Sequence, residues 1–144
     1  MRLSQIALVA LFASTMPAMA QSEEVLASIE NIHGDSDLFG EAFGALQDAF
    51  LFDDRTAFAD LAFYPLAING AEVSYEIETP EDLVENFDTI LTPDIQAALA
   101  SQDYADLIVT GEGVGFANGA LWMTNVCLDE ACAETQWGIV SINN

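Results

Sequence analysis

Positive charge is almost absent from this sequence. Its 144 residues contain no lysine, and Arg2 and Arg55 are set against 24 aspartates and glutamates, which gives a formal net charge of −22. A chain with so few cations cannot neutralise nucleic-acid phosphates, so nucleic-acid binding is excluded. Docking on anionic lipid through a basic patch is excluded for the same reason. Hydrophobic residues make up 52% of the chain, which exceeds what a disordered acidic tail contains, so a packed core is expected.

Complete metal-binding and nucleotide-binding motifs are also missing from the sequence. Glycines 111, 113 and 115 lack the G-x-G-x-x-G spacing of a dinucleotide-binding loop. The segment from Asp35 begins like a calcium loop, but Leu46 stands where that loop requires its last glutamate. Asp129 and Glu130 alone are too few ligands for a metal site. We therefore expect neither a metal nor another cofactor.

The first twenty residues have the pattern of a secretory signal peptide. Arg2 supplies a basic start, residues 6–12 form a short apolar run, and Ala18-Met19-Ala20 fits a cleavage site. Pro17 interrupts the apolar run before it reaches the length of a membrane span. We expect cleavage after Ala20, a periplasmic or secreted protein, and no membrane attachment after cleavage. All 24 acidic residues would remain in the mature chain.

The rest of the chain predicts a polar lead-in over residues 21–35 and a single domain over residues 36–144. Apolar residues recur at helical spacing at Phe39, Phe43, Leu46 and Phe50. Ser36 or Asp37 could cap this helix, and Asp53 or Asp54 could cap a short one that follows. Thr-Pro pairs at residues 79–80 and 92–93 are typical helix starts. They predict one helix over residues 79–91 and a shorter helix after Pro93.

Two Asn-Gly pairs predict hairpins, because a two-residue turn of this type requires positive φ at both positions. With Asn69-Gly70 as the turn, strands over residues 63–68 and 71–78 pair, and Tyr64 lies opposite Tyr75. Pro65 indicates that the first of these strands lies at a sheet edge. Further strands are expected at residues 107–110, 114–117, 120–128 and 135–142, with Asn118-Gly119 turning the middle pair. This order predicts an α+β fold in which helices pack on one side of an antiparallel sheet.

The two cysteines, Cys127 and Cys132, predict a disulfide across a four-residue hairpin loop. If they lie opposite one another, Trp122 lies opposite Trp137 in the same register. This pair could form an aromatic wall of a pocket, or it could simply pack in the core.

With these elements placed, the chain resembles the NTF2-like superfamily, and in particular exported members of that superfamily. The resemblance runs from about Asp60 to Asn144 and rests on Tyr64-Pro65-Leu66 before Asn69-Gly70, the helix over residues 79–91, and the meander over residues 113–122. It implies a cone-shaped, cystatin-like domain with a curved sheet wrapped around helices. Members include isomerases, cyclases, dehydratases and non-catalytic binding domains, and their sheets often form homodimers. The fold therefore does not select one function.

Catalytic candidates are few. An isomerase-type enzyme needs a carboxylate base in an apolar pocket, for which Asp60 and Glu112 are candidates, although both are expected to be exposed. A His–Asp pair or a Ser-His-Asp triad would have to use His33, the only histidine, and no nucleophile-elbow motif is present. His33 is therefore expected at the surface, and catalytic residues are not assigned.

The leading expectation is an exported, acidic, non-catalytic domain that binds a small ligand or a protein partner. The residues predicted to contact that ligand or partner are Arg55, Tyr64, Tyr75, Trp122 and Trp137. Arg55 could recognise an anion, or it could form a salt bridge at a helix start. The alternatives are an isomerase or cyclase with a pocket carboxylate, and an acidic inhibitor or immunity-type protein.

Overall fold

The computed structural model describes residues 18–144. The basic start and the apolar run of the predicted signal peptide lie outside the described residues. The helices, in chain order, are α1 (Ala18–His33), α2 (Ser36–Leu51), α3 (Arg55–Asp60), α4 (Pro80–Glu85), α5 (Phe87–Ile90), α6 (Pro93–Ala100) and the short 3₁₀ turns η1 (Tyr104–Asp106) and η2 (Ala117–Gly119). The strands are β1 (Ala62–Asn69), β2 (Ser74–Ile77), β3 (Ile108–Thr110), β4 (Gly113–Phe116), β5 (Leu121–Cys127) and β6 (Thr135–Asn143).

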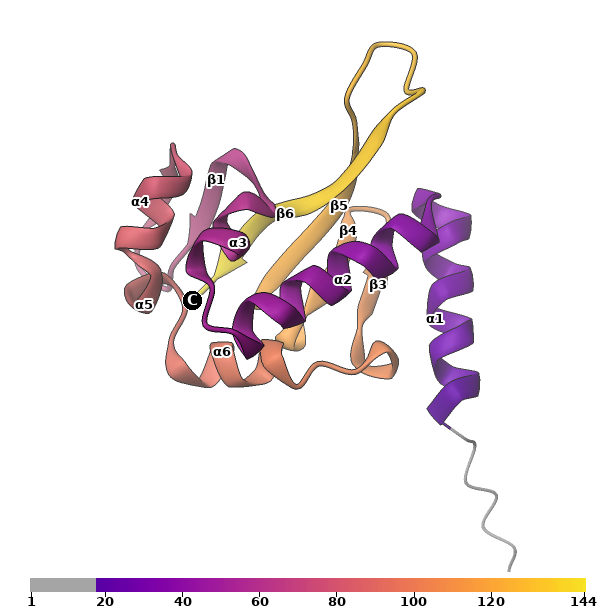
Figure 1. Cartoon of the computed structure of the whole chain (residues 1–144), viewed down its shortest axis with the longest axis horizontal. Coiled ribbons are helices and arrows are strands. Elements are labelled where there is room, and N and C mark those ends of the chain that lie inside the picture. The colour runs from indigo at the N-terminus through magenta and orange to yellow at the C-terminus, as the bar shows by residue number, and fades with distance from the viewer. Residues whose placement is uncertain (1–17) are drawn as a thin grey trace, which may run out of the picture.

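The strands form one curved sheet in the order β2-β1-β6-β5-β4-β3, with α2 and α3 across one face and α1 beside the β3 edge (Figure 1). The predicted α+β class is confirmed. The expectation of a purely antiparallel sheet is wrong, because β1 and β6 pair in parallel while the other neighbours are antiparallel. The last strand, β6, lies in the middle of the sheet. It pairs with β1 of the first hairpin on one side and with β5 of the meander on the other.

Strand β1 is not an edge strand, because it lies between β2 and β6. Its pairing with β6 is interrupted between Ala62 and Ala67, and Pro65 falls within this irregular stretch. A proline has no N–H to donate to a sheet, and a bulge is one of the positions that tolerate it. The prediction drawn from Pro65 is therefore wrong about the edge.

The first hairpin has a longer loop than Asn69-Gly70 predicts. Asn69 pairs with Ser74 and Ile68 with Tyr75, while the amide of Gly70 donates to the carbonyl of Val73 at 3.1 Å. Tyr64 therefore does not lie opposite Tyr75. The second Asn-Gly pair gives the expected register, in which Phe116 lies opposite Leu121.

The β5–β6 hairpin is also displaced from its predicted register. Cys127 lies opposite Thr135 instead of Cys132, and Trp137 lies opposite Asn125 instead of Trp122. The disulfide itself is confirmed, but it lies within the loop and does not join directly opposed strand residues. The predicted pairing of Trp122 with Trp137 is wrong.

The helices follow their sequence signals closely, with two differences. Helix α1 covers residues 18–33, although residues 18–20 were expected as the cleavage site and residues 21–35 as a polar lead-in, and Ile29 on this helix is buried in the core. The predicted helix over residues 79–91 is divided at Asn86 into α4 and α5. Thr79 caps α4 as expected, since its hydroxyl accepts from the Asp82 amide at 3.2 Å.

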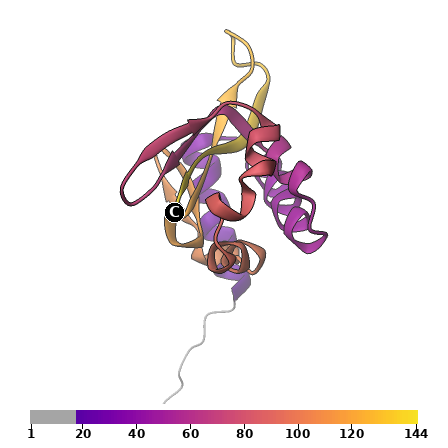
Figure 2. The same ribbon diagram turned by 90° about the vertical axis from the view of Figure 1, so that its left-hand side faces the viewer.

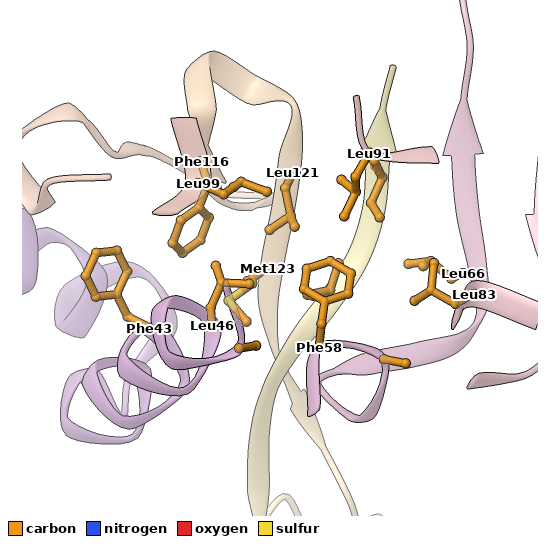
Figure 3. Close-up of a cluster of buried hydrophobic side chains, with 14 of the residues drawn as sticks. Phe43, Leu46, Phe58, Leu66, Leu83, Leu91, Leu99, Phe116, Leu121 and Met123 are labelled. Atoms are coloured by element: carbon orange, nitrogen blue, oxygen red, sulfur yellow. The ribbon is translucent and has the colours of Figure 1, made fainter. Parts of the chain in front are cut away.

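The core lies between the helices and the covered face of the sheet (Figure 3). The predicted face of α2 supplies Phe39, Phe43 and Leu46, all buried, and Phe50 packs against the same cluster. Figure 2 shows the opposite side of the sheet free of helices. Of the helices described in residues 18–144, none has the length and apolar character needed to cross a membrane.

Candidate binding site

The space between the helices and the sheet, where a cone-shaped domain would hold a ligand, is filled with side chains. Phe39, Phe58 and Phe116 are completely or almost completely buried there, and Figure 3 shows Phe43 and Leu46 of α2 directed at the sheet. Phe43 stacks on Phe116 with ring centroids 5.7 Å apart. Two of the larger hollows, of about 480 and 470 Å³, are open depressions on the surface.

The only buried polar side chain among the described residues is Gln102. Its Oε1 accepts from the Ala117 amide at 2.6 Å, and its Nε2 donates to the Asp103 carbonyl at 3.0 Å. Both ends of this amide are therefore satisfied by the backbone, which assigns Gln102 a structural role.

Every one of the 24 aspartates and glutamates is exposed to solvent. This includes Asp60 and Glu112, the two carboxylates considered as catalytic bases. A carboxylate becomes a good base near neutral pH when an apolar surrounding raises its pKa. None of the described carboxylates has such a surrounding.

Arg55 is bound within the domain. Its guanidinium donates to both oxygens of Asp88 in α5, at 2.9 and 3.1 Å, and lies 4.8 Å from the ring centroid of Phe87. The carboxylate of Asp53, two residues earlier in the sequence, lies 4.0 Å from Arg55 Nε. Arg55 thus fastens α3 to α5 through the bidentate geometry that arginine favours with a carboxylate.

Tyr64 is half-buried beside the end of α3, where its hydroxyl donates to the Ala59 carbonyl at 2.8 Å. Burial, followed by the nearby charges of Asp60 and Glu81, raises the pKa of Tyr64 to about 12. Asp60 and Glu81 also line a hollow of about 470 Å³ between α3 and α4, together with Pro80 and Val84. The carboxylates around this hollow favour cations over anions.

The three remaining predicted residues lie in different places. Tyr75 is exposed on the edge strand β2. Trp122 lies on the helix-free face of the sheet, where its ring covers Gly115 and its Nε1 donates to the Gly119 carbonyl at 3.0 Å. Trp137 is buried on the helix side, in edge contact with Phe39 at 5.0 Å between ring centroids. The five predicted residues therefore do not converge on one pocket.

A polar junction that the sequence does not reveal connects the α1–α2 turn to the base of the β5–β6 hairpin. The Asp35 carboxylate accepts from the Thr135 hydroxyl at 2.5 Å and from Asn125 Nδ2 at 3.3 Å. These bonds, that of Thr135 above all, lower the pKa of Asp35. The Asp35 carbonyl also accepts from Trp137 Nε1 at 3.1 Å, and His33 Nε2 bonds the Thr110 carbonyl at 2.7 Å. The His33 ring is therefore hydrogen-bonded to the backbone of β3, which gives it a structural role.

Beyond this junction the β5–β6 hairpin projects from the body of the domain, as both views show (Figures 1 and 2). Residues 127–134 are all exposed, and the hairpin loop that they form is called the arm below. The Cys127–Cys132 disulfide closes it, and the Asp129 carboxylate accepts from the amides of Ala133 and Glu134 at 2.9 and 3.2 Å. Leu128 is 53% exposed on this braced loop.

Another hollow, of about 270 Å³, lies at the foot of the arm between α2 and β6. Its lining is mostly apolar and includes Leu38, Ala42, Leu61 and Trp137, together with Glu41. Leu38 is itself exposed. The arm thus presents Leu128 beside carboxylates, and the hollow at its foot is mostly apolar.

Within residues 18–144, no three His, Cys, Asp or Glu side chains come close enough together to hold a metal ion. Comparison of the chain with protein-family models, with curated proteins and with solved structures found no match.

Proposed function

We propose that this chain is an exported, non-catalytic domain that binds a positively charged protein through its surface. The observation that carries the proposal is the exposure of all 24 carboxylates around a filled interior. Enzymes of the isomerase and cyclase type place a carboxylate among apolar groups beside a cavity that receives the substrate. In the described part of this domain every carboxylate is exposed, and the hollow beside Asp60 and Glu81 is an open depression, which supports binding over catalysis.

The charge of the domain indicates the kind of partner. Among the described residues Arg55 is the one arginine or lysine, and Asp88 already engages it. Like charges facing one another across an interface oppose association, so a stable complex requires cationic groups on the other protein. The long-range field of a chain with net charge −22 would also speed the encounter with such a partner.

The order of helices, hairpin, further helices and meander supports an NTF2-like architecture, and non-catalytic binding domains occur in that superfamily. Export is supported by the signal-peptide pattern of residues 1–20 and by the disulfide, which persists in oxidising compartments. An acidic inhibitor or immunity-type protein is the form of this function that agrees best with a filled interior.

The test is native mass spectrometry of the protein isolated from its own compartment, combined with binding measured at low and high salt. We expect a discrete complex of fixed stoichiometry with a basic protein. Its affinity should fall by about tenfold or more when the salt is raised from about 0.05 to 0.5 M, because screening weakens charge attraction between exposed groups. An unrelated acidic protein of similar net charge serves as the control for simple ion exchange.

Two results would overturn the proposal. One is a retained small molecule in place of a protein, which would assign a ligand-binding role to one of the surface hollows. The other is that the unrelated acidic protein captures the same proteins equally well, which would reduce the interaction to non-specific charge. A mass equal to two copies of this chain would instead support the predicted homodimer through the sheet.

A further inference from the structure

We infer that the arm, residues 127–134, is the element that enters the partner, with Leu128 as its apolar anchor and Glu130 and Glu134 beside it for cationic groups. This inference rests on the proposed function and names the contacting surface. The partner it fits is a protein with an apolar pocket bordered by lysine or arginine side chains.

Three independent restraints hold the arm in one shape although all eight of its residues are exposed. The disulfide joins Cys127 to Cys132, the Leu128 amide donates to the Glu134 carbonyl at 2.8 Å, and the Asp129 carboxylate accepts from two loop amides. Binding through a loop that is already ordered avoids much of the entropy loss of ordering it. The arm adds nothing to the core, so these restraints are not needed for packing. They support a role of the arm in recognition.

The base of the arm is fixed as well. Thr135 and Asn125 on its two strands are bonded to Asp35, and Trp137 donates to the same residue. The arm is therefore oriented relative to α2 and to the apolar hollow at its foot, which is about 270 Å³ in volume. A partner that receives Leu128 could place an apolar side chain of its own in this hollow.

The side chains of the arm define the chemistry of the partner. Asp129 is occupied within the loop, whereas Glu130 and Glu134 are exposed and the arm contains no cation. Leu128 stands next to these carboxylates, so the complementary surface must be apolar at its centre and positive at its border. Central apolar anchors usually carry most of the affinity of such an interface, while charges at the border select the partner.

The β1–β2 hairpin provides matched controls, because its loop also carries an exposed apolar residue beside a glutamate. Val73 is 65% exposed and Glu72 is exposed, but no disulfide restrains that loop. The full chain is prepared with a photoreactive benzoylphenylalanine at position 128 or, as the control, at position 73. Each is irradiated with the proteins of the chain's own compartment, and the cross-linked peptide is identified by mass spectrometry.

We expect cross-linking from position 128 to a lysine- or arginine-rich segment of one protein, and none from position 73. Leu128→Ala should weaken that complex by about tenfold or more. Glu130→Lys should weaken the complex at low salt by more than Leu128→Ala does. Val73→Ala and Glu72→Lys should change it by less than about twofold. Circular dichroism of the variants should match that of the parent chain, since none of these side chains is in the core.

The possible failures are distinguishable. A complex that forms normally but cross-links only from position 73, or tolerates Leu128→Ala, would retain the proposed function and overturn the role of the arm. A complex found with no form of the chain would overturn both. Loss of binding caused equally by the Val73 and Leu128 substitutions would also overturn the inference, because it would show no preference for the arm.

Discussion

The ring of Phe63 in β1 occupies the space in which a side chain at Gly138 of β6 would stand. A Cβ at Gly138 would clash with Cε2 of Phe63 and would lie 3.0 Å from the Leu61 carbonyl oxygen. Glycine in the middle of a strand commonly marks such a close approach. The contact lies at the parallel β1–β6 pair, which unites the first hairpin with the meander.

Substitution of Gly138 by alanine should therefore destabilise the domain by about 1–3 kcal/mol, because the added methyl group would overpack the site. Urea unfolding followed by circular dichroism measures the change. In a Phe63→Ala background the same substitution should cost less, since the main obstacle has been removed. An equal cost in both backgrounds would show that the ring is not the cause.

The Arg55–Asp88 pair should contribute a modest amount to stability. Both side chains are partly solvent-exposed, at 37% and 67%, so Arg55→Lys should lower the free energy of unfolding by about 0.5–1 kcal/mol. The loss arises because lysine cannot bond both carboxylate oxygens in parallel. Asp53→Asn, which alters only the 4.0 Å contact, is the control and should be nearly neutral in urea unfolding. A larger effect at Asp53 than at Arg55 would contradict this assignment.

Asp35 should make the domain sensitive to acid. Hydrogen bonds from Thr135 and Asn125 lower the pKa of the folded-state carboxyl below its unfolded value, which is about 3.9. The resulting stabilisation is complete above the unfolded pKa and is lost as the pH falls through the folded pKa. Asparagine tolerates the positive φ of 53° at this position, so Asp35→Asn changes little besides the charge.

The measurement is the difference in urea midpoint between the parent chain and Asp35→Asn as a function of pH. We expect the parent chain to be more stable at neutral pH and the difference to shrink below about pH 4. Repulsion among the other carboxylates acts on both proteins and cancels in the difference. A difference that stays constant down to strongly acidic pH would mean that the charge of Asp35 is not what stabilises the junction.

The Cys127–Cys132 disulfide should stabilise the domain without shaping its core. The loop that it closes is short, so replacing both cysteines by serine should lower the free energy of unfolding by about 2 kcal/mol. Circular dichroism should be unchanged, while proteolysis within residues 127–134 should become faster. Reduction of the parent chain by dithiothreitol should reproduce the loss. Unfolding of the whole domain on reduction would show that the arm has a larger structural role than its exposure implies.

The sequence predicted where the strands of the first hairpin lie more reliably than it predicted their pairing. Leu66 and Ile77 lie in the core, but they pair in a register displaced from the one that Asn69-Gly70 predicts. That displacement covers an even number of residues, so each side chain keeps its face. Between β5 and β6 the residue opposite Cys127 is Thr135 and not Cys132, a displacement by an odd number of residues. Trp122 and Trp137 therefore fall on opposite faces of the sheet. The predicted aromatic site was lost for this reason.

Local chemistry in the sequence determined the helix starts at Thr79 and Thr92, the buried face of α2, the turn at Asn118-Gly119 and the exposure of the carboxylates. Each of these depends on neighbouring residues or on the cost of burying charge. The tertiary structure alone decided the parallel pairing of β1 with β6, the filling of the interior, the partner of Arg55 and the bracing of the arm by Asp35. These features join segments that are distant in the chain, and no local pattern specifies which distant surfaces pack together.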